Sequence, residues 1–132
     1  STHNLVGSFG NRGTGQTEFT TPESIAVDKN GLIYIIERNK SSKGLRIYDK
    51  DFNYIKNVNL YYSDVLYAVK VDTSGNIYIG YRGSIYVKKE SEETIGYFAV
   101  SSIRSLALDA NGNIYTVSQT NHKITKYKKI IE

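Results

Sequence analysis

IAVDKNGLIYI, at residues 25–35, is the stretch of sequence that indicates the fold. The same phrase returns as VKVDTSGNIYI at residues 69–79 and as LALDANGNIYT at residues 106–116. Each copy contains an apolar residue, an Asp, two variable residues, a Gly and, after one further residue, Ile-Tyr. The successive Asp residues lie 44 and 37 positions apart, which defines a repeat of about forty residues.

The Asp-x-x-Gly element inside each copy predicts a hairpin turn. An Asp at the first turn position can accept hydrogen bonds from the backbone N–H groups two and three residues on, and Gly can take φ > 0 without a Cβ clash. We favour this turn over a calcium loop, because each copy offers one carboxylate and calcium takes about six to eight oxygens. The predicted structural turn residues are Asp28, Gly31, Asp72, Gly75, Asp109 and Gly112.

These turns would join strands at 25–28 and 32–36, 69–72 and 76–79, and 106–109 and 113–117. A third run of alternating apolar residues follows in every unit, and two units carry a fourth. The third runs are LRIYD from Leu45, SIYVKK from Ser84 and KITKY from Lys123, and the fourth runs are YIKNVNL from Tyr54 and ETIGYF from Glu93.

Four antiparallel strands in each repeat of about forty residues are typical of a propeller blade. An immunoglobulin-like sandwich would also show short strands, but it predicts no strand-turn-strand phrase three times over. We therefore predict an all-β chain, a β-propeller built from three four-stranded antiparallel blades.

The composition agrees with one domain of short strands and turns, since the 132 residues include 12 Tyr, 11 Gly and a single Pro. The absence of Cys excludes disulfides, thiolate zinc sites and a cysteine nucleophile. The net charge of +4 is only mildly basic. No apolar run approaches the roughly 20 residues that span a bilayer, so we expect no membrane insertion. The missing initiator Met suggests a processed precursor or an excised segment.

The stretch GTGQTEFTTPESIAVDKNGLIYIIE (13–37), together with NHKI (121–124), resembles NHL repeats, which build six-bladed β-propellers. The resemblance covers nearly the whole chain and is weakest in the second unit, where YYSDVLYA (61–68) replaces the Phe and Pro of the first. It implies half of a six-bladed propeller. The blade units would be about 13–60, 61–98 and 99–132, with a strand at 4–9 completing a blade.

The resemblance also implies a structural pair, because NHL repeats place an acidic residue at the end of the second strand, where it can pair with the Arg that opens the third. Glu37 and Arg46 match this pair. In the third unit Ser118 and Lys123 stand at those positions, so we expect the pair to be lost there. We interpret His122 as a turn residue rather than a ligand, because the only other His is His3.

The two ends of the chain predict association. Propellers close with about four to eight blades, so three leave an open arc with wet apolar flanks. The third unit stops after its third strand, whereas residues 4–9, NLVGSF, look like a fourth strand placed before the first unit. We expect each such strand to complete the third blade of another copy, closing a six-bladed homodimer. A fragment of a longer propeller and an open filament are the alternatives.

Loops of NHL-type propellers commonly bind proteins, RNA or carbohydrate, and function resides in such loops rather than in the fold. The candidate binding residues are Arg38, Lys40, Lys43, Arg46 and Tyr48, on or beside the loop at 38–43. We expect self-association as the main interaction and keep a protein partner open. We do not expect nucleic-acid binding, because most Tyr residues alternate with Ile or Val inside strands.

Six-bladed relatives of this kind include lyases and lactonases with metals in the central channel. The chain has no HExxH, GxSxG or Walker-type motif, so we expect no catalytic residue, no metal, no cofactor and no enzymatic activity. The composition is compatible with an extracellular, cell-surface or virion protein.

Overall fold

The computed structural model of the chain describes residues 2–38, 44–60 and 64–130. The described residues form β-strands and no helix. Three antiparallel sheets contain all but two of the strands in the described ranges, and β1 (Asn11–Arg12) and β2 (Glu18–Phe19) form a short parallel pair. Within the described ranges no helix is long and apolar enough to cross a membrane.

Two of the sheets have four strands in the order of the sequence. The first contains β3 (Pro22–Val27), β4 (Ile33–Glu37), β5 (Leu45–Tyr48) and β6 (Tyr54–Val58). The second contains β7 (Leu66–Val71), β8 (Ile77–Tyr81), β9 (Ser84–Lys88) and β10 (Thr94–Ala99). The third sheet has three strands among the described residues, β11 (Ser105–Leu108), β12 (Ile114–Ser118) and β13 (Lys123–Tyr127).

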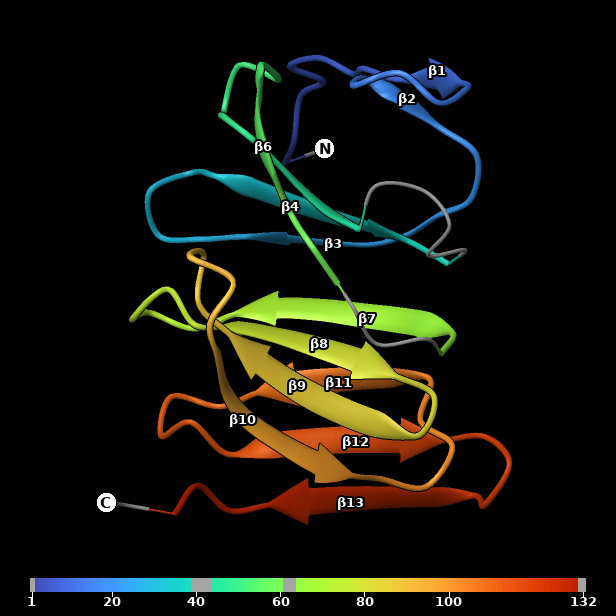
Figure 1. Cartoon of the computed structure of the whole chain (residues 1–132). Coiled ribbons are helices and arrows are strands. Elements are labelled where there is room, and N and C mark those ends of the chain that lie inside the picture. The colour runs from blue at the N-terminus through green and yellow to red at the C-terminus, as the bar shows by residue number, and fades with distance from the viewer. Residues whose placement is uncertain (1, 39–43, 61–63, 131–132) are drawn as a thin grey trace.

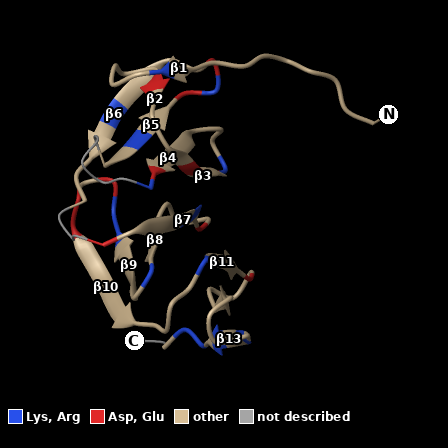
Figure 2. Cartoon of the chain, turned by 90° about the vertical axis from the view of Figure 1, so that its right-hand side faces the viewer, with Lys and Arg blue, Asp and Glu red and all other residues tan. Residues whose placement is uncertain are grey.

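The sheets follow one another in chain order (Figure 1), and Figure 2 shows that together they form an arc. The first strands of neighbouring sheets lie side by side, β3 against β7 and β7 against β11. The last strands, β6 and β10, lie on the opposite side of the arc. In a propeller blade, the first strand lies nearest the centre and the last strand lies outside. The strands of this chain have the same order, so the predicted fold class is confirmed. The third blade has three described strands.

Alternation along each strand places one set of side chains on each face of a blade. On β4, Tyr34 and Ile36 pack against the second sheet, whereas Ile33 and Ile35 face the N-terminal segment. The interface between the first and second sheets is formed by Tyr34, Ile36, Leu45, Ile47, Val58, Leu66, Val69, Ile77, Ile79 and Tyr81. The interface between the second and third sheets is formed by Ala68, Tyr78, Ile85, Ile103, Leu106 and Ile114.

The three Asp-x-x-Gly turns form at the predicted residues, with φ of 85°, 84° and 83° at Gly31, Gly75 and Gly112. In the first turn, Oδ1 of Asp28 accepts hydrogen bonds from the N–H groups of Asn30 at 2.8 Å and Leu32 at 2.9 Å. The side-chain bonds therefore come from two and four residues on. The N–H of Gly31, three residues on, donates instead to the Asp28 carbonyl at 3.1 Å.

The repeated Tyr has a role in the same turn. The hydroxyls of Tyr34, Tyr78 and Tyr115 donate to Oδ2 of the turn Asp at 2.9, 3.3 and 3.1 Å. Burial raises the pKa of Tyr34, and the hydrogen bond to Asp28 raises it further. The Ile-Tyr dipeptide thus serves both the sheet interface and the turn.

Candidate assembly interface

The outer edge of β13 has no neighbouring strand in the described part of the chain, whereas β5 pairs with β6 and β9 pairs with β10. The N–H of Asp109 donates to the carbonyl of Asn113 at 3.1 Å, which fixes one hydrogen-bonded pair between β11 and β12. Hydrogen-bonding direction alternates along antiparallel strands. The backbone groups of Ile124 and Lys126 therefore point away from β12, toward the open edge, where another strand can pair.

The N-terminal segment resembles the outer strand of a blade. Gly-Ser-Phe at 7–9 matches Gly-Tyr-Phe at 96–98 on β10. The ring of Phe98 lies 5.0 Å from Tyr127 of the third sheet, and the ring of Phe9 lies 5.0 Å from Tyr48 of the first.

Tyr48 and Tyr127 are equivalent, because they pair with Ile33 and Ile114, the first residues of β4 and β12. Phe9 therefore contacts the first sheet as the outer strand of a preceding blade would. It is held there by stacking on Phe52 with the ring centroids 4.6 Å apart.

Residues before Phe9 make few contacts. No strand is assigned at residues 2–10, so the predicted strand at 4–9 has no paired strand in the described part of the chain. Leu5 is 89% exposed and Val6 is 98% exposed. Figure 2 shows this segment leading away from the first sheet.

Apolar residues on the two terminal flanks are exposed where their equivalents inside the arc are buried. Ile25 on β3 is 57% exposed, but Val69 and Leu106, at the same register on β7 and β11, are 0% and 3% exposed. The first flank is covered over β4 and β5 by Phe9 and Phe19, which leaves β3 open.

The other flank, on the third sheet, shows the same contrast. Val117 is 44% exposed and its cross-strand partner Ile124 is 79% exposed. Their equivalents on the first sheet, Ile36 and Leu45, are both fully buried against the second sheet. These positions hold apolar side chains in the first and third blades, and in the second blade they hold Gly80 and Ile85. Only the terminal copies lack a neighbouring sheet.

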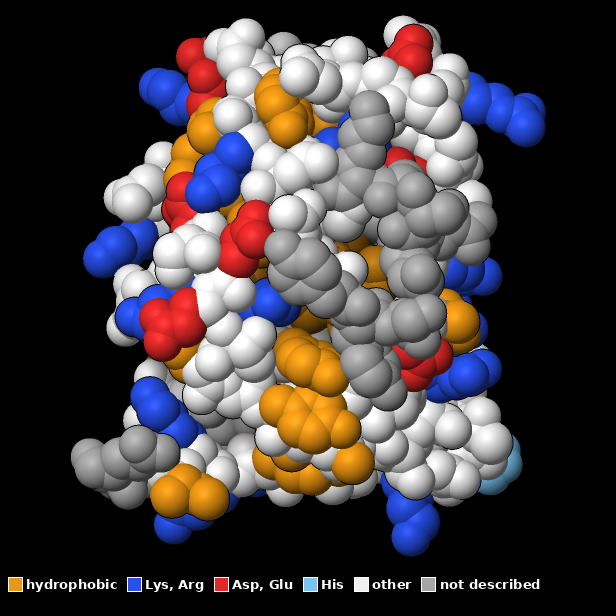
Figure 3. Space-filling model, viewed as in Figure 1, with side chains coloured by type: hydrophobic (Ala, Val, Ile, Leu, Met, Phe, Trp, Pro, Cys, Tyr) orange, Lys and Arg blue, Asp and Glu red, His pale blue; other side chains and the backbone are white. Residues whose placement is uncertain are grey.

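A hollow of about 640 Å³ lies between β10 and the residues that follow β13. Val87, Tyr97, Phe98 and Tyr127 are among the side chains that line it. Figure 3 shows hydrophobic side chains gathered on the molecular face over β9 and β10. The hollow therefore adjoins the unpaired edge of β13 with an apolar wall.

The predicted structural pair is present and deeply buried. Nη2 of Arg46 lies 2.6 Å from Oε2 of Glu37, and the two side chains are 2% and 3% exposed. Nη1 of Arg46 also donates to the carbonyls of Gly15, Gln16 and Glu18. The pair thus binds the N-terminal loop over the first sheet as well as joining β4 to β5.

The backbone holds the Glu37 carboxylate from the other side. The N–H groups of Thr20 and Thr21 each donate to Oε1 at 2.7 Å. Burial alone would raise the pKa of Glu37, but these two bonds, the Thr20 hydroxyl and the Arg46 charge outweigh burial and lower it.

Burial also corrects the predicted binding patch. Arg46 and Tyr48 are not exposed loop residues, because Arg46 is paired with Glu37 and the Tyr48 hydroxyl donates to the Gln16 carbonyl at 2.5 Å. Arg38 lies at the surface and pairs with Glu23 at 2.8 Å. Lys40 and Lys43 lie outside the described residues. The described part of the chain therefore brings no patch of these five residues together.

The strand register changes which residues of the other blades are equivalent to Glu37 and Arg46. Arg46 lies opposite Ile35, and Thr125 lies opposite the equivalent Thr116, so Thr125 rather than Lys123 replaces Arg46. In the second blade the two positions hold Tyr81 and Tyr86, whose rings meet edge to face at 5.4 Å. The sequence prediction erred because the turn between the second and third strands differs in length between units.

Metal ligands do not gather in the described part of the chain: no group of three or more His, Cys, Asp or Glu side chains there could hold an ion. His122 lies in the turn between β12 and β13 with φ of 57°.

No protein-family model matches the chain, and no curated protein does. The resemblance to NHL repeats therefore stays a prediction. Solved structures do resemble the chain, and among them are propeller-like proteins.

A luciferin-regenerating enzyme is 14% identical with a TM-score of 0.61, over 77% of this chain and 38% of the other. Virginiamycin B lyase from Staphylococcus aureus is 13% identical with a TM-score of 0.61, over 86% and 43%. A protein of unknown function from Bacteroides caccae is 14% identical with a TM-score of 0.57, over 85% and 48%. The chain thus spans less than half the length of each, and the similarity supports the propeller fold alone.

Proposed function

We propose that this chain is a non-enzymatic assembly module in which two copies close one six-bladed, NHL-like propeller. The main support for this proposal is the contrast in exposure at equivalent positions: Val117 and Ile124 are exposed where Ile36 and Leu45 are fully buried. Burial of apolar surface contributes about 25 cal/mol of stabilising free energy per Å² removed from water. Contact with a second copy that covers both flanks would therefore be favourable.

The two ends of the chain supply complementary parts for this closure. The third sheet lacks an outer strand among the described residues, and the segment before Phe9 has the sequence of an outer strand without a sheet. Exchange of the segment between two copies satisfies both, and two-fold symmetry makes both contacts identical.

The second blade predicts the register of the exchanged strand. On β10, Phe98 pairs with Ile85, Tyr97 with Tyr86 and Gly96 with Val87. By equivalence, Phe9 of one copy would pair with Ile124 of the other, Ser8 with Thr125 and Gly7 with Lys126. Leu5 would then lie opposite Tyr127, at the wall of the apolar hollow.

Six blades are supported by length. The aligned part of the chain covers 38% to 48% of the three solved structures described above, which is close to half of each. Two of those structures are named as enzymes, but identity of 13% to 14% carries no activity to this chain, because function belongs to sites rather than to folds.

Disulfide trapping tests the register, and the chain has no Cys to interfere. Ser8→Cys and Thr125→Cys are made separately, mixed and oxidised. Thr125 is hydrogen-bonded to β12, so its outward pairing is of the non-hydrogen-bonded kind, with Cα atoms about 4.5 Å apart and within disulfide range. A cross-linked pair of chains is expected on a denaturing gel.

The matched control is Ser8→Cys mixed with Lys126→Cys, because the side chain of Lys126 points to the opposite face of β13. Cross-linking of Thr125→Cys no stronger than this control would contradict the proposed exchange. That result is expected if the chain is instead half of a longer propeller, whose remaining blades supply the missing strand.

A further inference from the structure

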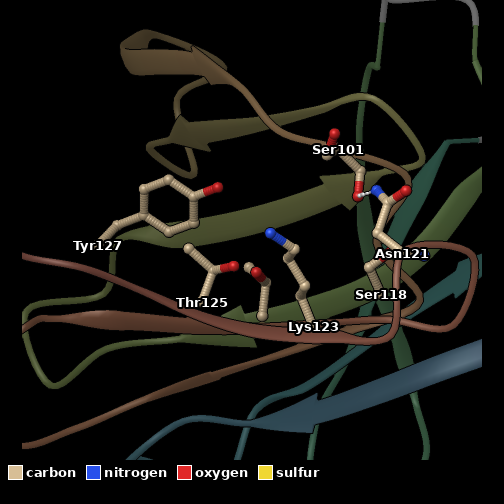
Figure 4. Close-up of a pocket in the computed structure, with 7 residues that line it drawn as sticks. Ser101, Ser118, Asn121, Lys123, Thr125 and Tyr127 are labelled. Atoms are coloured by element: carbon tan, nitrogen blue, oxygen red, sulfur yellow. Dashed lines mark hydrogen bonds between the residues drawn. The ribbon is translucent and has the colours of Figure 1, made fainter.

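A second, polar hollow of about 320 Å³ lies against the third sheet and shares Tyr127 with the apolar hollow. Its lining residues come from β12, from β13, from the turn between them and from the loop after β10. Figure 4 shows the amine of Lys123 and the hydroxyls of Thr125 and Tyr127 pointing toward the same space. The lining residues are Ser101, Thr116, Ser118, Asn121, Lys123, Thr125 and Tyr127.

The equivalent place in the first blade is filled by a carboxylate. Ser118 occupies the register position of Glu37, and Thr125 that of Arg46. Glu37 is held there by two backbone N–H groups, a hydroxyl and a guanidinium. The third blade keeps the space but not the acid, because Ser and Thr are much shorter than Glu and Arg.

The loop that supplies these donors in the first blade has its equivalent beside the hollow, where Ser101 is one of the lining residues. Counting back from the paired positions Ser24 and Ser105, the residues equivalent to Thr20 and Thr21 are Ser101 and Ser102. In the described part of the chain the N–H groups of Ser101 and Ser102 have no acceptor.

Further polar groups on the wall are free as well. The hydroxyls of Thr116, Thr125 and Tyr127 and the amine of Lys123 have no hydrogen-bond partner among the described residues. Thr116 and Ser118 are only 3% and 7% exposed, so the floor of the hollow consists of buried polar side chains. Polar groups at this depth favour a ligand that completes their hydrogen bonds.

We propose that this hollow binds a small hydroxylated carboxylate, with its acid group where Glu37 lies in the first blade. The N–H groups of Ser101 and Ser102 and the amine of Lys123 would take the carboxylate through charge-assisted bonds. The hydroxyls of Thr116, Thr125 and Tyr127 would face the hydroxyls of the ligand. All of these groups belong to one chain, so the site does not depend on the proposed dimer.

Amide chemical shifts of the ¹⁵N-labelled full chain test the proposal, with sodium glucuronate as the probe and glucose as the matched sugar without a carboxylate. At constant ionic strength, glucuronate should give saturable shifts at Ser101, Ser102 and Lys123, with at least a tenfold weaker response to glucose. Thr20 and Thr21, whose N–H groups already hold Glu37, should not move.

Two variants complete the test. Ser118→Glu places an internal carboxylate in the hollow and should abolish the shifts, whereas Lys123→Gln, at an exposed position, should keep the fold and weaken binding at least fivefold. No saturable shift in the parent chain, equal shifts with glucose, or undiminished binding in a folded Ser118→Glu or Lys123→Gln variant would overturn the proposal.

Discussion

At the scale of single residues, the Glu37–Arg46 pair shows how context changes the worth of an interaction. An exposed ion pair contributes about 1 kcal/mol at most, but both of these side chains are buried. Removing one partner of a buried pair leaves an uncompensated charge, which costs far more than the pair itself contributes.

The first prediction is that Arg46→Ala lowers the free energy of unfolding by about 3–5 kcal/mol, because the Glu37 carboxylate loses its counter-ion while still buried. Thr125→Ala, at the equivalent position of the third blade, should change it by no more than about 0.5 kcal/mol. Urea unfolding at one fixed chain concentration measures both. Similar losses in the two variants would show that the pair is not what stabilises the first blade.

Acid sensitivity is the second prediction. The pKa of Glu37 in the folded chain lies below its ordinary value of 4.5, so its contribution to stability is complete above that pH and is lost as the pH falls through the folded value. Urea midpoints of the parent chain should therefore drop on acidification below about pH 4.5, and Glu37→Gln should flatten this dependence. An unchanged pH profile in Glu37→Gln would contradict the assignment.

Asp109 gives a direct readout of turn electrostatics. The side-chain hydrogen bond from Asn113 lowers its pKa most, burial opposes this, and bonds from the backbone of Asn113 and Asn111 and from Tyr115 lower it further, to about 2. Carboxyl NMR titration should find this midpoint near that value in the parent chain and closer to the ordinary 3.8 in Asn113→Ala. The same midpoint in both proteins would contradict the hydrogen-bonded turn.

At the scale of elements, the strand-turn-strand phrase was the most predictable part of the fold, because its causes are local. Asp28, Gly31 and Tyr34 lie within seven residues of one another, and each bond of the turn closes inside that window. Predictions that depended on distant parts of the chain were less accurate. The burial of Arg46 and Tyr48 follows from a loop about thirty residues earlier, which no local pattern reveals.

The candidate site was predictable only in outline. The unpaired third strand and the unattached segment at 4–9 follow from the count of strands in each unit. The match of 7–9 with 96–98 was available in the sequence but was missed, because three residues carry little signal without the ring contacts of Phe9 and Phe98. The polar hollow could not be predicted without the strand register, which places Thr125 and not Lys123 opposite Thr116.

Gly75 offers a clean probe of the repeated turn. Its φ is +84° and a Cβ there would meet nothing within 4 Å, so a substitution reports backbone strain alone. Gly75→Ala should lower the free energy of unfolding by about 1–2 kcal/mol, and Gly75→Asn by less, since Asn tolerates the left-handed region. Equal stability of Gly75→Ala and the parent chain would show that this turn is not held in that conformation.

At the scale of the whole molecule, the chain is an arc whose inner interfaces are complete and whose two ends are not. Two apolar residues with the same exposed fraction allow the ends to be distinguished from ordinary surface, because Val117 and Ile55 are both 44% exposed. Val117 lies on the free flank of the third sheet, whereas Ile55 lies on the outer strand β6.

Val117→Glu should therefore weaken association of the proposed dimer by at least tenfold, about 1.4 kcal/mol, because a charge would be buried between copies. Ile55→Glu is the matched control and should leave association unchanged. Sedimentation velocity across a dilution series measures both, with circular dichroism to verify the fold. Equal weakening in the two variants would remove the free flank from the interface.

Open blade edges should join copies of this chain. The molar mass of the chain in solution, measured by light scattering after size exclusion, tests this most directly. We expect a species of twice the 14.9 kDa chain mass at micromolar concentration, which shifts toward one chain mass on dilution or when residues 1–8 are removed. A folded particle of 14.9 kDa at every concentration, with the full N-terminal segment present, would contradict it.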